Sequence, residues 1–323
     1  MPVRYTSPSL GGHRQTVLPA GHFEVSLSYR RLRADDWFIL DTLTPSDGSR
    51  APGGQPNIFT IHSVDAAVAY GVSERLSVRL TVPMASGTNS RIHPDGVRHE
   101  TSGSGIGDVN VVGTMWLMDP LTHATGNVAV GLGVKAPTGS HTIRDDFGLP
   151  AGTVQHEVHP GIQMGDGGWG IIVQAQGFRT LVGNLAGYAF ASYQLSPRDT
   201  TEVTFAPTTT SHFSVPDVYH ARLGLAYAVL PSRGLSASLG LRADGIPTND
   251  LVGGSDGLRV AARTVFLDPG LALSIGANDF TLSVPIRVHG QFYRGTPLPA
   301  PNVQSDRGDL AKAVLFLGYY RRF

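Results

Sequence analysis

The 323-residue chain contains no cysteine, which excludes disulfide frameworks, thiolate metal sites and cysteine nucleophiles together. It has no run of roughly 18 consecutive apolar residues, the length that a transmembrane helix needs. Charge is scarce and balanced, since 15% of the residues are charged and 25 Lys plus Arg face 25 Asp plus Glu. A formal net charge of zero gives no electrostatic reason to bind nucleic acid, so we expect no nucleic-acid partner.

A secretory signal is also lacking. The first 20 residues, MPVRYTSPSLGGHRQTVLPA, contain no apolar stretch after a basic start. Two alternatives stay open: the export signal was removed from a precursor, or the chain is not exported.

Alternating apolar residues are the strongest pattern that the sequence does contain. In LSVRLTVPM, residues 76–84, apolar side chains recur at every second position. The same alternation returns over residues 280–289, where five apolar residues in register exclude a helix. With 40 glycines and 22 prolines, the chain is poor helix material and favours amphipathic strands.

Counting segments between turn signals predicts about 14 strands, an even number typical of bacterial outer-membrane barrels. The weakest are 155–165 and 200–209, and without them the count is 12. The predicted strands are 22–33, 58–72, 75–87, 105–117, 125–137, 155–165, 168–180, 184–195, 200–209, 218–229, 234–245, 258–275, 279–293 and 310–323.

Connection lengths give a second sign of a barrel. Short turns are predicted at GVSER, GDGG, LPSRG and GAND, and long polar loops at 34–57, 88–104, 140–154, 246–257 and 294–309. Outer-membrane barrels have short turns on the periplasmic rim and long loops outside, so an even strand count places both termini on the periplasmic side. Aromatic residues near strand ends fit an interfacial girdle: Tyr29, Tyr70, Trp116, Trp169, Tyr219, Tyr227, Tyr293, Tyr319 and Tyr320.

The main alternative fold is a soluble β-sandwich or a propeller. The sequence shows neither a blade-length repeat nor a linker between two sandwiches. The patterns therefore favour an all-β fold, a single closed antiparallel transmembrane β-barrel in the bacterial outer membrane. We expect residues 1–20 to form a periplasmic N-terminal segment and candidate plug, and residues 21–323 to form the barrel.

Four longer motifs resemble the family of outer-membrane transporters associated with the meta-cleavage pathway of phenol degradation. They are GIGDVNVVGTMWL from Gly105, VGLGVKAPTGS from Val130, GLRADGIPTNDLVGGSDGLR from Gly240 and LDPGLALSIGANDFTLSVPIRV from Leu267. The resemblance implies a barrel with a transport role, with aromatic or other hydrophobic compounds as the expected solutes, and it supplies no catalytic residues. The ending GYYRRF also resembles the signal that barrel-assembly machinery recognises, through the C-terminal Phe323.

If the apolar strand faces meet lipid, the alternate faces point into the lumen. They place there Glu24, Arg30, Arg79, Asp108, Lys135, Arg222, Arg242, Asp268 and Arg287. Asp108 and Lys135 lie on neighbouring strands, which predicts an inward salt bridge, and Arg79 on the adjacent strand would extend it into a mixed-charge wall. Two interpretations remain: the charges pair to stiffen the barrel, which the general pairing of buried charges favours, or they form a constriction that selects solutes.

The lumen of a 14-stranded barrel is about 25 to 30 Å across by strand spacing and tilt, too wide for side chains to fill. Something must plug it, or it is an open channel. Residues 1–20 and the loop 34–57 are the predicted plugs, and Trp37 and Phe38 of that loop are the predicted entry site.

No GxSxG, HExxH or phosphate-loop framework is present, so we expect neither a catalytic site nor a cofactor. The loop RIHPDGVRHE contains His93, Asp95, His99 and Glu100, but without regular spacing a solvated loop is favoured over a metal site. The favoured function is passive uptake of small, hydrophobic or aromatic solutes by a monomer embedded in outer-membrane lipid. The alternatives are a closed structural or ligand-binding barrel and, below it, an outer-membrane hydrolase.

Overall fold

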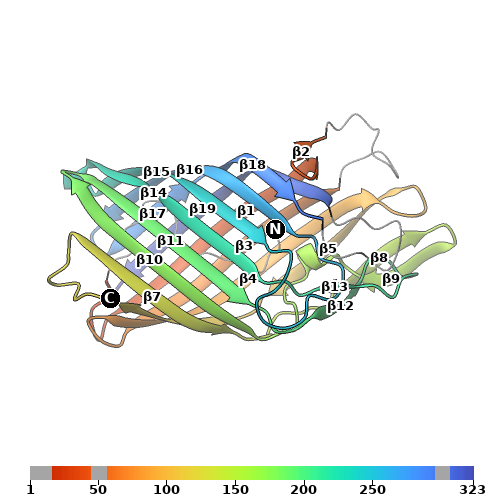
Figure 1. The fold of residues 1–323 in the computed structure, drawn as a ribbon, viewed down its shortest axis with the longest axis horizontal. Helices are drawn as coiled ribbons and strands as arrows, with labels where there is room; N and C mark the ends of the chain where they lie inside the picture. The colour runs from red at the N-terminus through yellow and green to blue at the C-terminus, as the bar shows by residue number, and fades with distance from the viewer. Residues whose placement is uncertain (1–16, 45–56, 295–305) are drawn as a thin grey trace.

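A computed structural model describes residues 17–44, 57–294 and 306–323. In this part of the chain, twelve antiparallel strand positions close into one barrel, because the last strand pairs with the first (Figure 1). The ring runs β1 (Phe23–Ile39), β3 (Ile58–Gly71), β4 (Leu76–Ile92), β6 (Asn110–Trp116), β7 (Gly126–Lys135), β10 (Gly170–Val182), β11 (Leu185–Leu195), β14 (Val218–Leu230), β15 (Leu235–Ile246), β16 (Ala262–Ile275), β17 (Asn278–Ser283) and β19 (Arg307–Arg322).

The remaining strands lie at the long-loop end of the barrel or extend a ring position. β5 (Arg98–Ile106) continues the position of β6 along β4, and β18 (Ile286–Phe292) continues that of β17 along β16. Short hairpins are made by β8 (Arg144–Leu149) with β9 (Gly152–Glu157) and by β12 (Thr200–Thr204) with β13 (His212–Ser214), and β2 (Thr42–Leu43) pairs with the end of β1. Two 3-10 turns are η1 (Pro160–Ile162) and η2 (Pro231–Arg233). Among the described residues, no helix is long and apolar enough to cross a membrane.

The smaller strand count of 12 is confirmed, and the two segments that were weakest in the sequence are the two outside the ring. Residues 155–165 cover the end of β9, the turn η1 and a stretch that enters the barrel. Residues 200–209 begin with β12, which pairs only with β13. Both are extended chain, and sequence alternation alone does not distinguish ring strands from hairpins above the rim.

The faces of the strands are inverted relative to a soluble protein. Along β7, Val128, Val130, Leu132 and Val134 are exposed, whereas the residues between them are buried. In β1, Phe23, Val25 and Leu27 are exposed on one face and Glu24 and Ser26 are buried on the other. An apolar outside and a polar inside are what a barrel needs when lipid surrounds it.

Aromatic side chains border part of this apolar belt, as expected for a girdle. Phe23 packs on Tyr70 with ring centroids 4.7 Å apart, and Phe280 packs on Tyr319 at 5.3 Å, both near the short-turn rim. Two members of the predicted girdle are wrong: Trp116 and Tyr320 are buried on the inner face. Their places in the sequence put both residues near strand ends, but a residue at a strand end can face either the lipid or the lumen.

The short-turn rim carries both ends of the barrel, as predicted. The N–H of Phe323 donates to the carbonyl of Phe23 at 2.9 Å, which ties the last described residue to the first strand. The predicted turn GDGG is an exception: residues 165–168 are not a rim turn but belong to the connection between β7 and β10.

Replacing Leu132 by Arg tests the orientation of the strands relative to lipid. Leu132 is 66% exposed within the apolar belt, and an Arg on the lipid face near the bilayer midplane costs about 2 to 4 kcal/mol. We expect that loss in denaturant unfolding from lipid vesicles. Leu121→Arg, in the short connection between β6 and β7 where Leu121 is 77% exposed, is the matched control and should change the stability little. Equal effects of the two substitutions would contradict the lipid-facing assignment.

Candidate functional site: the barrel lumen

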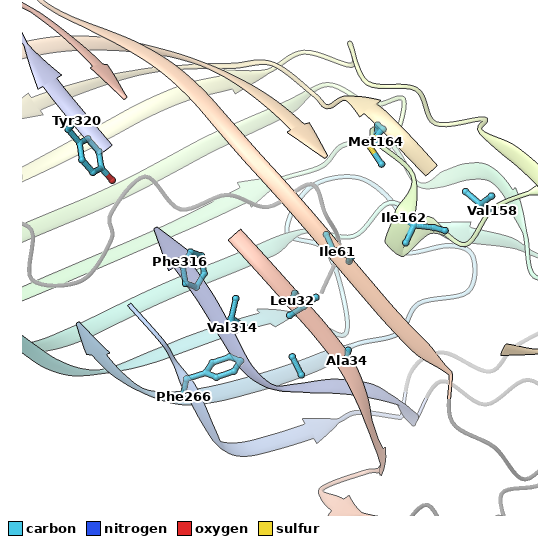
Figure 2. Packing of buried hydrophobic residues seen from close by; sticks show 11 residues of the cluster. Leu32, Ala34, Ile61, Val158, Ile162, Met164, Phe266, Val314, Phe316 and Tyr320 are labelled. Atoms are coloured by element: carbon cyan, nitrogen blue, oxygen red, sulfur yellow. The ribbon is translucent and has the colours of Figure 1, made fainter. Parts of the chain in front are cut away.

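The connection between β7 and β10 folds back into the lumen, and we call residues 158–168 the inward segment. Ile162 and Met164 are completely buried, at 0% exposed. Gln163 at the same depth ties the segment to its own connection, because its side chain accepts from the N–H of Ile143 and donates to the Ile143 carbonyl, both at 2.9 Å. Ile162 and Ile61 of β3 belong to the same packed cluster, which Figure 2 shows.

Glycines on the barrel wall make room for this segment. A Cβ on Gly103 of β5 would lie 2.5 Å from the carbonyl oxygen of Ile162, and one on Gly87 of β4 would lie 2.8 Å from the Ile162 side chain. Backbone without side chains therefore lets the inward segment approach the wall closely. The predicted plugs were residues 1–20 and loop 34–57; residues 1–16 and 45–56 lie outside the described residues, and the inward segment is a plug that the sequence did not reveal.

A buried ion cluster holds the foot of the inward segment. The Lys135 Nζ of β7 donates to Asp108 Oδ2 at 2.9 Å, to Asp166 Oδ1 at 2.5 Å and to the Gly168 carbonyl at 2.9 Å. All three charged side chains are below 5% exposed. We call Lys135, Asp108 and Asp166 the Lys135 cluster. The predicted Asp108 to Lys135 salt bridge is thus present, and Asp166 joins it from the segment that the sequence assigned to a turn.

Arg79 does not extend this cluster. Its guanidinium donates to Glu24 at 2.6 Å and to Ser26 Oγ at 3.1 Å, across β3 and toward β1. The expected mixed-charge wall of Arg79, Asp108 and Lys135 is therefore wrong, because the Arg79 side chain leans to the opposite neighbour. Arg322 of β19 joins Glu24 at 3.6 Å and also pairs with Asp279.

The other predicted lumen charges are paired as well. Arg222 of β14 donates to Asp268 of β16 at 2.5 Å, and Arg242 of β15 donates to Asp244 at 2.8 Å. Asp244 also pairs with His220. Arg30 Nε donates to Ser63 at 3.2 Å, and Arg287 pairs with Asp36 at 2.5 Å. Arg222, Arg242 and Arg287 thus have carboxylate partners and Arg30 has a hydroxyl partner, and a role of these residues in solute passage stays a prediction.

The two predicted entry residues lie on a strand and not in a loop. β1 continues to Ile39, so Trp37 and Phe38 belong to the barrel wall above the apolar belt. Phe38 is buried with Phe292 and Leu310, and the Arg287 guanidinium lies 4.6 Å from its ring centroid. The charged run from Arg30 to Asp36 looks like a loop because a strand that leaves the lipid no longer needs an apolar outer face.

Apolar residues also line one side of the lumen. A single cluster joins residues of four strands to the inward segment: Leu32, Ala34, Ile61, Phe266, Ala311, Val314, Phe316 and Tyr320 on the wall, with Val158, Ile162 and Met164 (Figure 2). The wall strands β16, β19, β1 and β3 follow one another around this side of the ring, with β17 and β18 between β16 and β19. Charged and amide side chains of β7, β10, β11, β14 and β15 line the other side, among them Lys135, Gln176, Gln194, Arg222 and Arg242.

The histidines of RIHPDGVRHE lie in a stack above the barrel. His93 is sandwiched between Phe147 of β8 and His99 of β5, with ring centroids 4.4 and 4.7 Å away. His99 Nε2 is 2.6 Å from Asp95, and the N–H of Gly148 donates to His93 Nδ1 at 2.9 Å. Among the described residues, no group of three or more ligating side chains could hold a metal ion. The stack instead fastens the β8–β9 hairpin to β4 and β5.

Acid is expected to loosen this hairpin. Burial, followed by the nearby Arg91 and His99, lowers the pKa of His93 to about 4. The folded contact therefore requires neutral His93. Its contribution to the free energy of unfolding is complete above the ordinary histidine pKa of about 6.5, and it falls by up to about 3 kcal/mol as the pH drops from 6.5 to 4. Hydrogen exchange of the Gly148 amide, corrected for its intrinsic pH dependence, should lose protection between pH 7.5 and 5. His93→Phe should abolish that pH dependence, and protection that is unchanged at pH 5 in the native chain would contradict it.

These features define a class: a closed antiparallel β-barrel with a lipid-type outer surface and a lumen occupied by a folded-in loop. No family model matches the chain, and no curated protein matches it in sequence. Among solved structures, the chain is similar to an outer membrane channel from Pseudomonas putida F1, with 15% identity over 99% of this chain and 100% of that one and a TM-score of 0.67. It is also similar to the β domain of the Bordetella autotransporter BrkA, with 11% identity over 94% and 100% of the two chains and a TM-score of 0.50. At these identities, the likeness concerns the fold.

Proposed function

We propose that the chain is a bacterial outer-membrane channel for the passive uptake of small apolar or aromatic compounds. One observation carries the proposal: the inner faces of β16, β19, β1 and β3 hold an apolar cluster, which shares the lumen with buried charged and amide side chains. A solute that is mostly apolar and carries a small polar group meets a matching surface for each part. The likeness in fold to an outer membrane channel supports the location and the transport role.

The finer assignments follow from the same proposal. The motifs around Gly105, Val130, Gly240 and Leu267 support a link to aromatic degradation such as the meta-cleavage pathway of phenol, with uptake and no catalysis by the chain itself. Phe323 lies at the end of β19 and is 59% exposed, so it is accessible to barrel-assembly machinery. The expected partners are the lipid around the apolar belt and a solute in the lumen. We expect the chain to be a monomer.

The lumen charges alone do not favour an ion-selective pore. Arg79, Arg222, Arg242 and Arg287 each have a carboxylate partner within 2.8 Å. Paired charges offer little net field to a passing ion, because each positive group is matched beside it. Selection by apolar contact is therefore the better supported mechanism.

Reconstitution tests the proposal against a closed binding barrel. The refolded chain should run at a heat-sensitive mobility in a gel, and vesicles that contain it should swell faster in benzoate than in glucose at equal osmolarity. Benzoate kept ionised above pH 7.5 is a suitable solute because it then crosses lipid slowly by itself. A heat-sensitive band without any swelling would favour a closed structural or ligand-binding barrel, and a chain that needs no detergent would overturn the membrane assignment.

A further inference from the structure

The chain's own inward segment packs against one end of the apolar side of the lumen, where Ile162 lies beside Ile61. We define the apolar stripe as Leu32 and Ala34 of β1, Ile61 of β3, Phe266 of β16, and Val314 and Phe316 of β19. Val158, Ile162 and Met164 of the inward segment belong to the same packed cluster (Figure 2). Ile162 of the folded loop therefore covers the Ile61 end of a surface that a hydrophobic solute would use.

The inward segment lies inside the barrel without being one of the strands of its wall. Ring strands are held by continuous ladders on both sides, whereas the inward segment has none with the barrel. It is held by hydrogen bonds to its own connection, where Ser140 accepts from the N–H groups of Met164 and Gly165 at 3.0 and 2.8 Å, and by the Lys135 cluster at its foot. Its contact with the stripe is apolar. Apolar contacts are non-directional, so the apolar surface of another molecule can replace the segment there.

The apolar stripe has a charged neighbour beside Phe316. The Arg242 guanidinium lies 4.5 Å from the centroid of the Phe316 ring, and its Nε donates to Asp244. A ring stacked beside Phe316 would meet the edge of this ion pair, which suits an aromatic compound better than an aliphatic chain of the same size.

We propose that the apolar stripe is a binding site for small aromatic molecules and that the inward segment occupies its Ile61 end as an internal competitor. An aromatic solute displaces Ile162 from the stripe, and Met164, two residues further along the same segment, moves with it and becomes exposed. This inference rests on the proposed function for its biological meaning, but the binding event itself does not depend on transport.

Thiol labelling measures the displacement directly, because the native chain has no cysteine. Met164→Cys, at a position that is 0% exposed, is placed in the full refolded chain and treated with a membrane-impermeant maleimide. Toluene should raise the labelling rate at least tenfold, and the same concentration of glycerol should leave it unchanged. Ile162→Cys, also at 0% exposed, repeats the measurement if the first variant folds poorly.

Two comparisons keep the test specific. Val154→Cys on β9 is 39% exposed and should label fast with or without toluene. Phe316→Ala in the Met164→Cys chain should raise the toluene concentration needed for half the effect by at least threefold. The proposal is overturned if toluene leaves the Met164→Cys rate unchanged, if that thiol is fully reactive without toluene, or if Phe316→Ala leaves the dose response unmoved.

The outcome also separates this inference from the proposed function. Toluene-dependent labelling in a chain whose vesicles do not swell would support the binding site and contradict the channel. Swelling in benzoate with a Met164→Cys thiol that never responds to toluene would support the channel and overturn the internal competitor.

Discussion

Lys135→Met should open the lumen. The substitution leaves the Asp108 and Asp166 carboxylates buried close together without their shared cation, since both accept from Lys135 Nζ. Removing one partner of a buried ion group costs about 3 to 5 kcal/mol, and the cheapest relief is for Asp166 to leave with the inward segment. We expect the swelling rate of vesicles in benzoate to rise by about tenfold or more while the barrel remains heat-modifiable.

The matched control is Lys312→Met, because Lys135 and Lys312 are the two lysines of the chain and Lys312 is exposed on β19. It removes the same charge and should leave swelling unchanged. Asp166→Asn in the Lys135→Met chain should restore part of the closure, since it relieves the repulsion. If Lys135→Met swells like the native chain, the Lys135 cluster does not hold the plug.

Asp268→Asn should cost the barrel about 3 to 5 kcal/mol of unfolding free energy. Asp268 is 0% exposed, accepts from Arg222 Nη2 at 2.5 Å and also accepts from the Ser283 hydroxyl. It therefore joins β14, β16 and β17 inside the lumen. The neutral amide leaves the Arg222 guanidinium without this counter-charge.

The double variant Arg222→Met with Asp268→Asn removes both charges and should recover most of the lost stability, because an apolar replacement of a buried pair is often neutral. Denaturant unfolding in the same detergent measures all three chains. Preference for benzoate over glucose should be unchanged in the double variant if the pair is structural. A double variant that stays as unstable as Asp268→Asn would contradict this account of the pair, and one that loses the preference would assign the pair a role in solute selection.

Much of the barrel could be predicted from the sequence because strand alternation records which side faces lipid. The positions of Lys135, Arg222 and Asp268 on inner faces follow from period two alone. The Asp108 to Lys135 contact could be predicted because Asp108 lies just before β6, whose first residue Asn110 pairs with Lys135 of β7.

The inward segment could not be predicted for a physical reason. Residues 155–165 and GDGG look like a strand and a turn, and local pattern does not say whether extended chain joins the ring or folds into it. Asp166 was missed with it, although an acidic residue beside three glycines is a weak sign of a tight, buried bend. The direction of the Arg79 side chain could not be predicted either, because a long side chain on an inner face can lean toward either neighbouring strand.

Uptake by intact cells tests the central claim most directly, because apolar molecules cross phospholipid vesicles unaided but must pass a polar saccharide layer to enter a Gram-negative cell. Cells that make the chain should take up radiolabelled naphthalene several-fold faster than cells without it, and Lys135→Met should raise the rate further. Equal uptake with and without the chain, at matched levels of heat-modifiable barrel in the outer membrane, would contradict a channel for apolar and aromatic solutes.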